Sequence, residues 1–344
     1  MPLPMEHDGG LTDQQLRELE FEQHQAQREM DALDARAVAQ IARARARLAG
    51  GAMGLDWPFP TIQQKYGSIP YPSWTGIAAM TGAGKTSFLM SLVLEWVRLS
   101  QRVYILPFEV DADTMRINLA AQASGLHPGR VAQGSWGELA MDAKERLAAQ
   151  MAWQTDAGMA LLRFSERTTA TVEEMQEEMD LASRWGASVV ILDHFHRLDG
   201  VENYRTTKAH AHNLTELVKE YDTPILAALQ INRNEKDFFA AHQPPHFQTI
   251  QGGEVIRQES HVVLGLYRPL SNAVSRKDLA MIRAGVGEKK IGDVVKPACV
   301  GVHLMKHRYR GELVGDTLEL GWDHGRVVDP ITQATDAFEG RYGV

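Results

Sequence analysis

The chain has 344 residues, a formal net charge of −8, a hydrophobic content of 44% and one cysteine. It is long enough for one large or two modest domains with a sizeable core, and its single cysteine excludes a disulfide framework and a cysteine-rich zinc site. The acidic balance argues against a surface coated for nonspecific nucleic-acid binding, and the lack of a secretion signal or of an apolar run near the ~20 residues of a membrane span predicts a cytoplasmic protein without membrane contact.

The N-terminal region, residues 1–54, is predicted to be a helical arm. Residues 11–49 contain no proline or glycine and are dense in Ala, Glu, Gln and Arg, which is typical of one long helix. Their apolar residues form only a broken stripe, so we expect the helix to dock on a neighbouring subunit; a solvated arm is the alternative. Residues 55–73, which hold several prolines, are predicted to be a linker.

Residues 74–328 are predicted to form the main domain, with residues 329–344 as a C-terminal tail. Short apolar runs alternate with helical patterns, which indicates an α/β fold with a mostly parallel sheet and helices on both faces. The expected strands are Arg102–Phe108, Ala187–Leu192, Pro224–Gln230, His261–Leu266, Val300–Met305 and Thr317–Trp322. The expected helices are Asp113–Ala123, Trp136–Trp153, Val172–Arg184 and Tyr204–Tyr221.

A phosphate-binding loop is the strongest motif in the chain. An apolar, strand-like segment runs into Thr81, Gly82, Ala83, Gly84, Lys85, Thr86 and Ser87, after which a helical pattern begins. Glycines let the backbone curl so that its N–H groups face phosphate oxygens, Lys85 can reach the β- and γ-phosphates, and Thr86 can ligate Mg²⁺. Ala79 stands where the general pattern has its first glycine. We therefore expect a nucleotide triphosphatase; a plain strand–turn–helix corner is the alternative.

Polar residues end three of the expected strands. Asp193 follows the apolar run 189–192, where a carboxylate can ligate the Mg²⁺ of a bound triphosphate. Glu109 ends the strand before it in the sequence, where it can orient or deprotonate the attacking water, and Gln230 ends a third strand, where it can sense the γ-phosphate. A turn-initiating acid, a helix N-terminal charge and a satisfied polar strand end are the respective structural alternatives.

These three strand ends and the phosphate loop follow RecA-like logic, and the chain resembles the ATPase domain of DnaB-like replicative helicases over roughly residues 74–328. The family tolerates alanine at position 79. The resemblance rests further on Phe108-Glu109-Val110, Asp193-His194, Gln230-Ile231-Asn232-Arg233, residues 251–258 and Lys306-His307-Arg308. It departs from the family at residues 1–54, which do not match the helical N-terminal domain, and at the unassigned loop 268–297.

The resemblance implies ATP and Mg²⁺ as ligands and a homo-oligomeric ring, expected to be hexameric. Lys306 and Arg308 match the Lys-x-Arg pair that such helicases direct into the neighbouring subunit's site, and we expect them to project from an exposed turn. Single-stranded DNA is the expected substrate, and primase or a loader is a further candidate partner.

Two loops after strand ends are candidates for DNA binding, because cations next to aromatic residues suit single strands. The candidates are Arg197, Arg205 and Lys208 after Asp193, and Arg233 and Lys236, with Phe238, Phe239 and Phe247, after Gln230. Ordinary solvated loops are the alternative. Four histidines, at 194, 196, 210 and 212, lack the acids and spacing of a zinc signature.

The sequence thus predicts a RecA-like ATPase that translocates on single-stranded DNA as a replicative helicase. Two alternatives belong to other classes. One is an ATP-dependent replication accessory factor or loader, which would not need two basic, aromatic loops. The other is a recombinase-like filament, which would not close into a ring.

Overall fold

The computed structural model describes residues 27, 54–132, 139–155, 160–199, 204–231, 242–271, 274–286 and 290–332. Contacts divide the chain into a unit of residues 1–52 and a unit of residues 53–344. In the first unit Gln27 is described and helical, and the rest of the predicted helix 11–49 lies outside the described residues. The fold below is that of the second unit.

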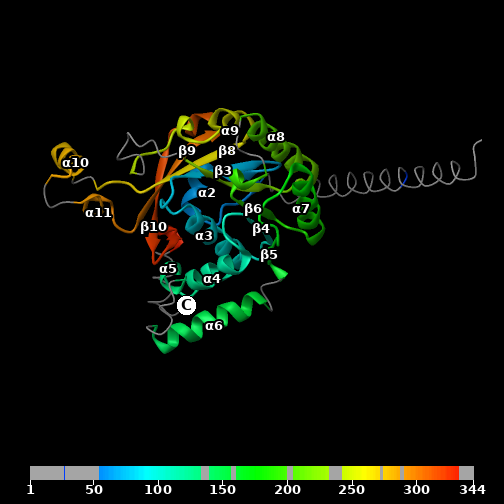
Figure 1. Ribbon diagram of the computed structural model, residues 1–344, viewed down its shortest axis with the longest axis horizontal. Coiled ribbons are helices and arrows are strands. Elements are labelled where there is room, and N and C mark those ends of the chain that lie inside the picture. Colours follow the sequence, from blue (N-terminus) through cyan, green and yellow to red (C-terminus); the bar gives the residue numbers. More distant parts are fainter. Residues whose placement is uncertain are drawn as a thin grey trace, which may run out of the picture. The chain divides into compact units, whose positions relative to one another are not determined.

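The described residues form a nine-stranded sheet with the order β11-β10-β9-β8-β3-β7-β6-β4-β5 (Figure 1). Its strands are β3 (Trp74–Ala79), β4 (Val103–Pro107), β5 (Leu162–Phe164), β6 (Val189–Asp193), β7 (Ile225–Gln230), β8 (Val262–Tyr267), β9 (Cys299–His307), β10 (Thr317–Asp323) and β11 (Arg326–Val328). The pairs from β8 through β3, β7, β6 and β4 to β5 are parallel. The pairs β8–β9, β9–β10 and β10–β11 are antiparallel. The predicted α/β fold with a mostly parallel sheet is confirmed.

Helices connect the strands. They are α2 (Pro60–Tyr66), α3 (Lys85–Arg98), α4 (Ala112–Ala123), α5 (Pro128–Ala132), α6 (Met141–Thr155), α7 (Val172–Trp185), α8 (Tyr204–Tyr221), α9 (Gly253–Glu259), α10 (Arg276–Arg283) and α11 (Ile291–Val294). Local signals explain their ends: Thr171 and Glu174 form a capping box at the start of α7, and Gly186 ends that helix with a φ of 82°. Asp111 caps α4 by accepting a hydrogen bond from the Thr114 backbone.

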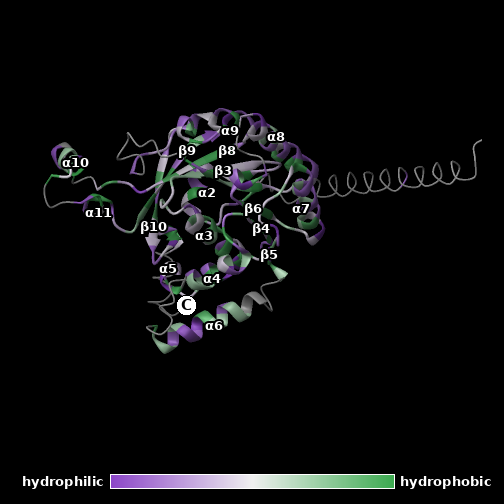
Figure 2. Ribbon diagram, viewed as in Figure 1, coloured by the Kyte–Doolittle hydropathy of each residue, from purple (hydrophilic) through white to green (hydrophobic). Residues whose placement is uncertain are grey.

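The sheet separates two apolar cores because successive side chains of each strand point to opposite faces. Ile77 of β3 and Ile191 of β6 pack in one core with α3 and α4. Their neighbours Ala78 and Leu192 pack in the other core with α7, α8 and α9. Figure 2 shows the central strands as mostly hydrophobic ribbon with hydrophilic stretches on the surrounding helices. Parallel strands buried on both faces need continuous apolar runs, and this requirement made them readable in the sequence.

The segment 55–73, which we expected to be a linker, contributes to the core. It contains α2 and two short strands, β1 (Gly54–Leu55) and β2 (Ile69–Pro70), which pair with each other. Phe59 packs edge-to-face on Phe88 of α3 with ring centroids 6.0 Å apart, and Trp57 stacks on Trp96 at 6.5 Å. The packed unit therefore begins before Trp74, and the prolines of this segment shape turns and a helix start within it.

The loop 268–297, left unassigned by the sequence, carries α10 and α11 between β8 and β9, and an antiparallel bridge joins Leu270 to Val295 near its base. Of the predicted tail 329–344, residues 329–332 are described, and Asp329 is buried and accepts hydrogen bonds from the backbone and hydroxyl of Thr61. No helix in the described part of the chain is long and apolar enough to cross a membrane.

Candidate nucleotide-binding site

The phosphate loop lies between β3 and α3, at the carboxyl edge of the parallel strands. Gly82 and Gly84 have φ angles of 82° and 99°, in the left-handed region that glycine adopts without strain. No side chain caps the N-terminus of α3. The first-turn N–H groups of a helix have no intrahelical acceptors, so this end is suited to bind an anion.

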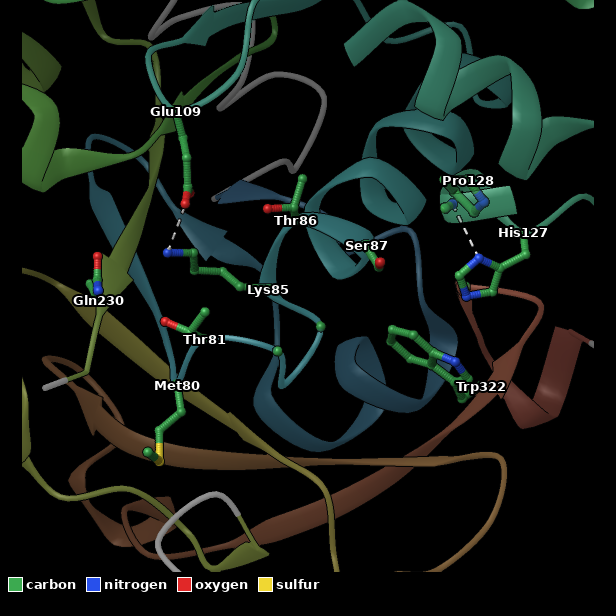
Figure 3. Close-up of a pocket in the computed structure, with 14 residues that line it drawn as sticks. Met80, Thr81, Lys85, Thr86, Ser87, Glu109, His127, Pro128, Gln230 and Trp322 are labelled. Atoms are coloured by element: carbon green, nitrogen blue, oxygen red, sulfur yellow. Dashed lines mark hydrogen bonds and ion pairs between the residues drawn. The ribbon is translucent and has the colours of Figure 1, made fainter. Parts of the chain in front are cut away.

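A cavity of about 330 Å³ opens above the loop. Figure 3 shows the side chains that surround it, which come from the loop, two strand ends, the start of α5 and the end of β10. Its walls include Thr81, Gly82, Gly84, Lys85, Thr86, Ser87, Glu109 and Gln230 among the residues predicted from the sequence. Ala83 differs: its side chain is buried in the core and its N–H donates to the Met80 carbonyl, at 3.0 Å.

Lys85 and Glu109, which line the cavity, form an electrostatic cluster with Asp193, which is buried next to them and is not among the lining residues. Lys85 Nζ lies 4.0 Å from Glu109 Oε2, and the Glu109 backbone N–H donates to the Asp193 carbonyl at 2.9 Å. Burial lowers the pKa of Lys85, while Asp193 and Glu109 oppose that change. The strand ends predicted to converge on the phosphate loop are therefore neighbours in space.

Asp193 is fully buried, and burial, with the nearby Glu109, raises the pKa of its carboxyl to about 6 against the opposing charge of Lys85. Neither carboxylate oxygen has a hydrogen-bond partner within the described residues. Buried carboxylates require compensation by a cation or by donors. A carboxylate and a hydroxyl beside a phosphate loop fit Mg²⁺, which prefers oxygen ligands and keeps several waters and substrate oxygens in its shell.

The four histidines do not lie together. His194 and His196 follow β6 with ring centroids 5.8 Å apart, whereas His210 and His212 lie on α8. Burial lowers the pKa of His194 to about 3, and it also lowers the pKa of His196. The described residues contain no group of three or more His, Cys, Asp or Glu side chains that could hold a metal ion.

Lys306 and Arg308 bind α9 of their own chain. Lys306 Nζ donates to the carbonyl oxygens of Arg257 and Ser260 and, at 3.4 Å, of Gln258. Arg308 Nη2 donates to the Gln258 carbonyl at 3.1 Å. We expected both to project from an exposed turn; Arg308 is exposed, but Lys306 is half-buried within β9, because the strand continues to His307.

The DNA-binding candidates lie at two places. Arg197 is exposed in the 3-10 turn after β6, and Arg205 and Lys208 belong to the first turns of α8, where Lys208 is exposed. Arg233, Lys236, Phe238 and Phe239 lie outside the described residues, and Phe247 packs half-buried against the core. Of this second loop the structure describes Ile231 and residues 242–250, and Ile231 and Ile250 form an antiparallel bridge at its base.

Several residues that line the cavity were not predicted from the sequence, among them His127 and Trp322. His127 lies just before α5, and Trp322 lies near the end of β10, on the antiparallel part of the sheet. The Trp322 ring approaches so closely that a Cβ on Gly84 would lie 2.5 Å from it, and the Arg268 guanidinium lies 4.7 Å from its centroid. No sequence motif includes His127 or Trp322. The only signal for either was that Trp322 is an aromatic residue at the end of a predicted strand.

Comparisons with known proteins identify the family and the fold. Residues 58–317 match the family described as the DnaB-like helicase C-terminal domain. The fold is similar to a structure described as "The Structure Of A DnaB-Like Replicative Helicase And Its Interactions With Primase", with a TM-score of 0.63 and 16% identity over 80% of this chain and 63% of that one. It is also similar to a second solved structure, described as an ATPase domain, with a TM-score of 0.63 and 14% identity over 84% of this chain and 96% of that one. At such identities these two likenesses show the fold.

Proposed function

The chain belongs to the family of DnaB-like helicase C-terminal domains, and on that premise we propose that it is an ATP-dependent DNA helicase that translocates on single-stranded DNA in replication. The observation that carries the proposal is the convergence of Lys85, Glu109 and Asp193 beside a phosphate loop. One chain thereby supplies a phosphate-binding cation, a candidate metal ligand and a candidate base for water. An ATPase needs all three within reach of one γ-phosphate.

Each residue of the cluster has a distinct role in this proposal. The N–H groups at the start of α3 and the Lys85 ammonium bind the phosphates, and Thr86 and Asp193 hold Mg²⁺, which would neutralise charge on the β- and γ-phosphates. Glu109, exposed at the cavity edge, orients and deprotonates the attacking water. Gln230, which lines the same cavity, contacts the γ-phosphate through an amide that does not titrate.

Trp322 is proposed as the surface on which the nucleobase lies. Its ring borders the cavity beside Gly84, and the contact with Arg268 holds it in place. Aromatic rings stack with any base, so this contact would add affinity without selecting one nucleotide.

The site is proposed to be completed by a neighbouring subunit in a ring, which we expect to be hexameric. Lys306 and Arg308 would stabilise charge in the adjacent subunit's transition state. Their hydrogen bonds to α9 would then be exchanged for phosphate oxygens.

DNA is proposed to contact the two loops that follow β6 and β7, through Arg197, Arg205 and Lys208 and through Arg233 and Lys236. The compartment is proposed to be the cytoplasm. The 63% coverage of the first structure means that the chain spans less than two thirds of that protein's length. A primase contact, which the description of that structure names for its own helicase, is a proposal for this chain.

The test combines hydrolysis with strand separation. ATP hydrolysis is measured with and without single-stranded DNA, and unwinding is measured on a forked duplex, for the parental protein and for Lys85→Ala. We expect DNA-stimulated hydrolysis and unwinding by the parent, and neither by the variant, because a fixed cation is lost from the phosphate site. Hydrolysis without unwinding in parental rings would contradict the helicase and favour the accessory factor.

A further inference from the structure

The turn after β6 holds two histidines between the candidate catalytic glutamate and the end of β7. Phe195, between them, is fully buried and stacks on Trp74 of β3 with ring centroids 6.2 Å apart. The Trp74 indole N–H in turn donates to Thr215 of α8 at 3.1 Å. The turn is thus anchored in the core through Phe195, so the backbone of the two flanking histidines is fixed and their rings can move only about their side-chain bonds.

Hydrogen bonds define the proton position on His196. The backbone N–H of Gln230 donates to His196 Nδ1 at 3.3 Å, so this nitrogen carries no proton. His196 Nε2 lies 3.0 Å from the carbonyl oxygen of Gln251, which can only accept, so Nε2 carries the proton. The neutral ring therefore makes one hydrogen bond to the end of β7 and one to Gln251, two residues before α9 begins.

The two hydrogen bonds of His196 reach the two chain segments that form the stem of one loop. Gln230 and Gln251 immediately flank the bridge between Ile231 and Ile250, which closes the base of the loop proposed to contact DNA. A change in the separation of the two chain segments at this stem must stretch or break at least one hydrogen bond of His196.

His194 continues the chain of contacts toward the cavity. The backbone N–H of His196 donates to His194 Nδ1 at 3.1 Å, so the proton of this ring lies on Nε2 as well. That Nε2 is 3.8 Å from Glu109 Oε2, and the ring is buried. His194 thus offers a donor to the glutamate and cannot act as the base itself. Contacts of this length in a site without substrate shorten when the catalytic arrangement forms.

We propose that His194 and His196 are positioning residues that transmit the geometry of the Gln230–Gln251 stem to the carboxylate of Glu109. The inference rests on the proposed function, since it takes Glu109 as the residue that orients water and the loop above the stem as a DNA contact. DNA bound to the loop changes the separation of the two chain segments at the stem, and the His196 ring moves with them. His194 then sets the orientation of the Glu109 carboxylate. Single strands thereby change turnover more than they change ATP binding.

Two amide substitutions at His194 test the link. In His194→Asn the amide oxygen replaces Nδ1 as acceptor, and the donor to Glu109 is lost; in His194→Gln the terminal amide nitrogen replaces Nε2 as donor. We expect His194→Asn to lower kcat about tenfold with KM changed less than about twofold, because loss of an outer-shell partner typically costs 10- to 100-fold. His194→Gln should return kcat to within about threefold of the parent. His212→Asn, at an exposed position on α8, is the matched control.

Transmission is measured as the ratio of hydrolysis with single-stranded DNA to hydrolysis without it. His196→Ala should lower this ratio by about threefold or more, while the Kd for the same oligonucleotide changes less than about twofold. If that variant does not fold, as judged by its melting curve, His196→Gln replaces it with the same expectation, since it keeps the donor to Gln251 and lacks the acceptor for Gln230.

The outcomes distinguish a failure of the inference from a failure of the proposed function. Equal kcat values for the two His194 variants, or an unchanged ratio in the His196 variant, would overturn the inference while the parental ATPase stands. A parental protein that does not hydrolyse ATP, or that ignores single strands, would overturn the proposed function and the inference together.

Discussion

Lys85 differs from the pair Lys306 and Arg308 in the groups that surround its charge. Lys85 lies beside carboxylates, 4.0 Å from Glu109 and close enough to Asp193 to oppose the rise of its pKa. Lys306 and Arg308 instead donate to the backbone carbonyls at the end of α9. Burial and the adjacent arginines also lower the pKa of Lys306 to about 8.

The difference favours Lys85 as the proposed phosphate ligand. Lys85 lines the cavity, so a phosphate group could contact it without first breaking hydrogen bonds to backbone carbonyls. The C-terminus of a helix attracts cations, so Lys306 and Arg308 stabilise α9 until a stronger anion is offered. A role in trans would therefore require exchange, and the predictions below test that contrast.

The largest expected effect concerns Arg308. If it acts on a neighbour's site, Arg308→Ala subunits alone should hydrolyse ATP about 10³-fold more slowly, as when an arginine finger is lost. Mixing them with Lys85→Ala subunits should restore part of the activity, at interfaces where an intact phosphate loop meets an intact arginine. Steady-state hydrolysis across a series of mixing ratios measures this.

A mixture that stays inactive at every ratio would contradict the shared site. So would an Arg308→Ala protein that hydrolyses ATP at the parental rate as a monomer, which would leave Arg308 with its observed role on α9. Light scattering on the same samples shows whether the variants still assemble.

The next effect concerns Glu109. Glu109→Gln keeps the shape of the side chain but removes the base, so kcat should fall about 10²-fold while nucleotide binding is largely retained. Binding is followed by titration with a fluorescent nucleotide, and hydrolysis by phosphate release. Parental turnover in the variant would reassign Glu109 to a structural role beside Lys85.

The sequence could predict the proximity of candidate residues where that proximity follows from local pattern. Asp193, Glu109 and Gln230 each end an apolar run, and parallel strands bring their carboxyl ends to one edge, so their proximity was predictable. Trp322 reaches the same cavity from β10, whose place depends on two antiparallel pairings, β8–β9 and β9–β10, that no local pattern predicts. His196 was equally hidden, because its role depends on two backbone groups from different segments.

The prediction of a linker over residues 55–73 was wrong for another reason. Its prolines indicated a linker, yet Pro60 begins α2 and the aromatic residues around it are buried against α3. Proline composition does not distinguish an exposed linker from a packed segment with fixed turns, whereas buried Trp57 and Phe59 do.

A smaller effect tests the surroundings of Lys306 and Arg308. Burial, with Arg308, Lys306 and Lys219, lowers the pKa of His261 to about 4. Between pH 6.5 and 4 the unfolded chain binds a proton there that the folded chain does not, so this stability is full above pH 6.5 and is lost as the pH falls. His261→Asn keeps an acceptor for the backbone N–H of Trp74, but its side chain does not titrate.

The difference in free energy of unfolding between parent and His261→Asn should therefore shift by about 2 kcal/mol between about pH 7 and pH 5, in favour of the variant at the lower pH. Urea unfolding at both pH values measures it, and the other buried histidines cancel because both proteins contain them. A constant difference would mean that His261 titrates in the folded chain as in the unfolded chain, and a shift in favour of the parent at the lower pH would mean that it is protonated when folded.

The smallest effect concerns Trp322, which shares the cavity with Lys85 but is proposed to touch the nucleobase instead of phosphate. Trp322→Ala should raise the Kd for ATP about tenfold, within the roughly 1–3 kcal/mol that stacking on a base contributes, and Trp322→Phe should recover most of that affinity. Because the ring also packs against Gly84, its loss can disturb the phosphate loop directly. Competition by tripolyphosphate, which has no base, separates the two: its affinity should be unchanged in Trp322→Ala and strongly reduced in Lys85→Ala. Equal weakening of ATP and tripolyphosphate in Trp322→Ala would make the tryptophan a support for the loop, and the cavity's two ends would then both serve phosphate.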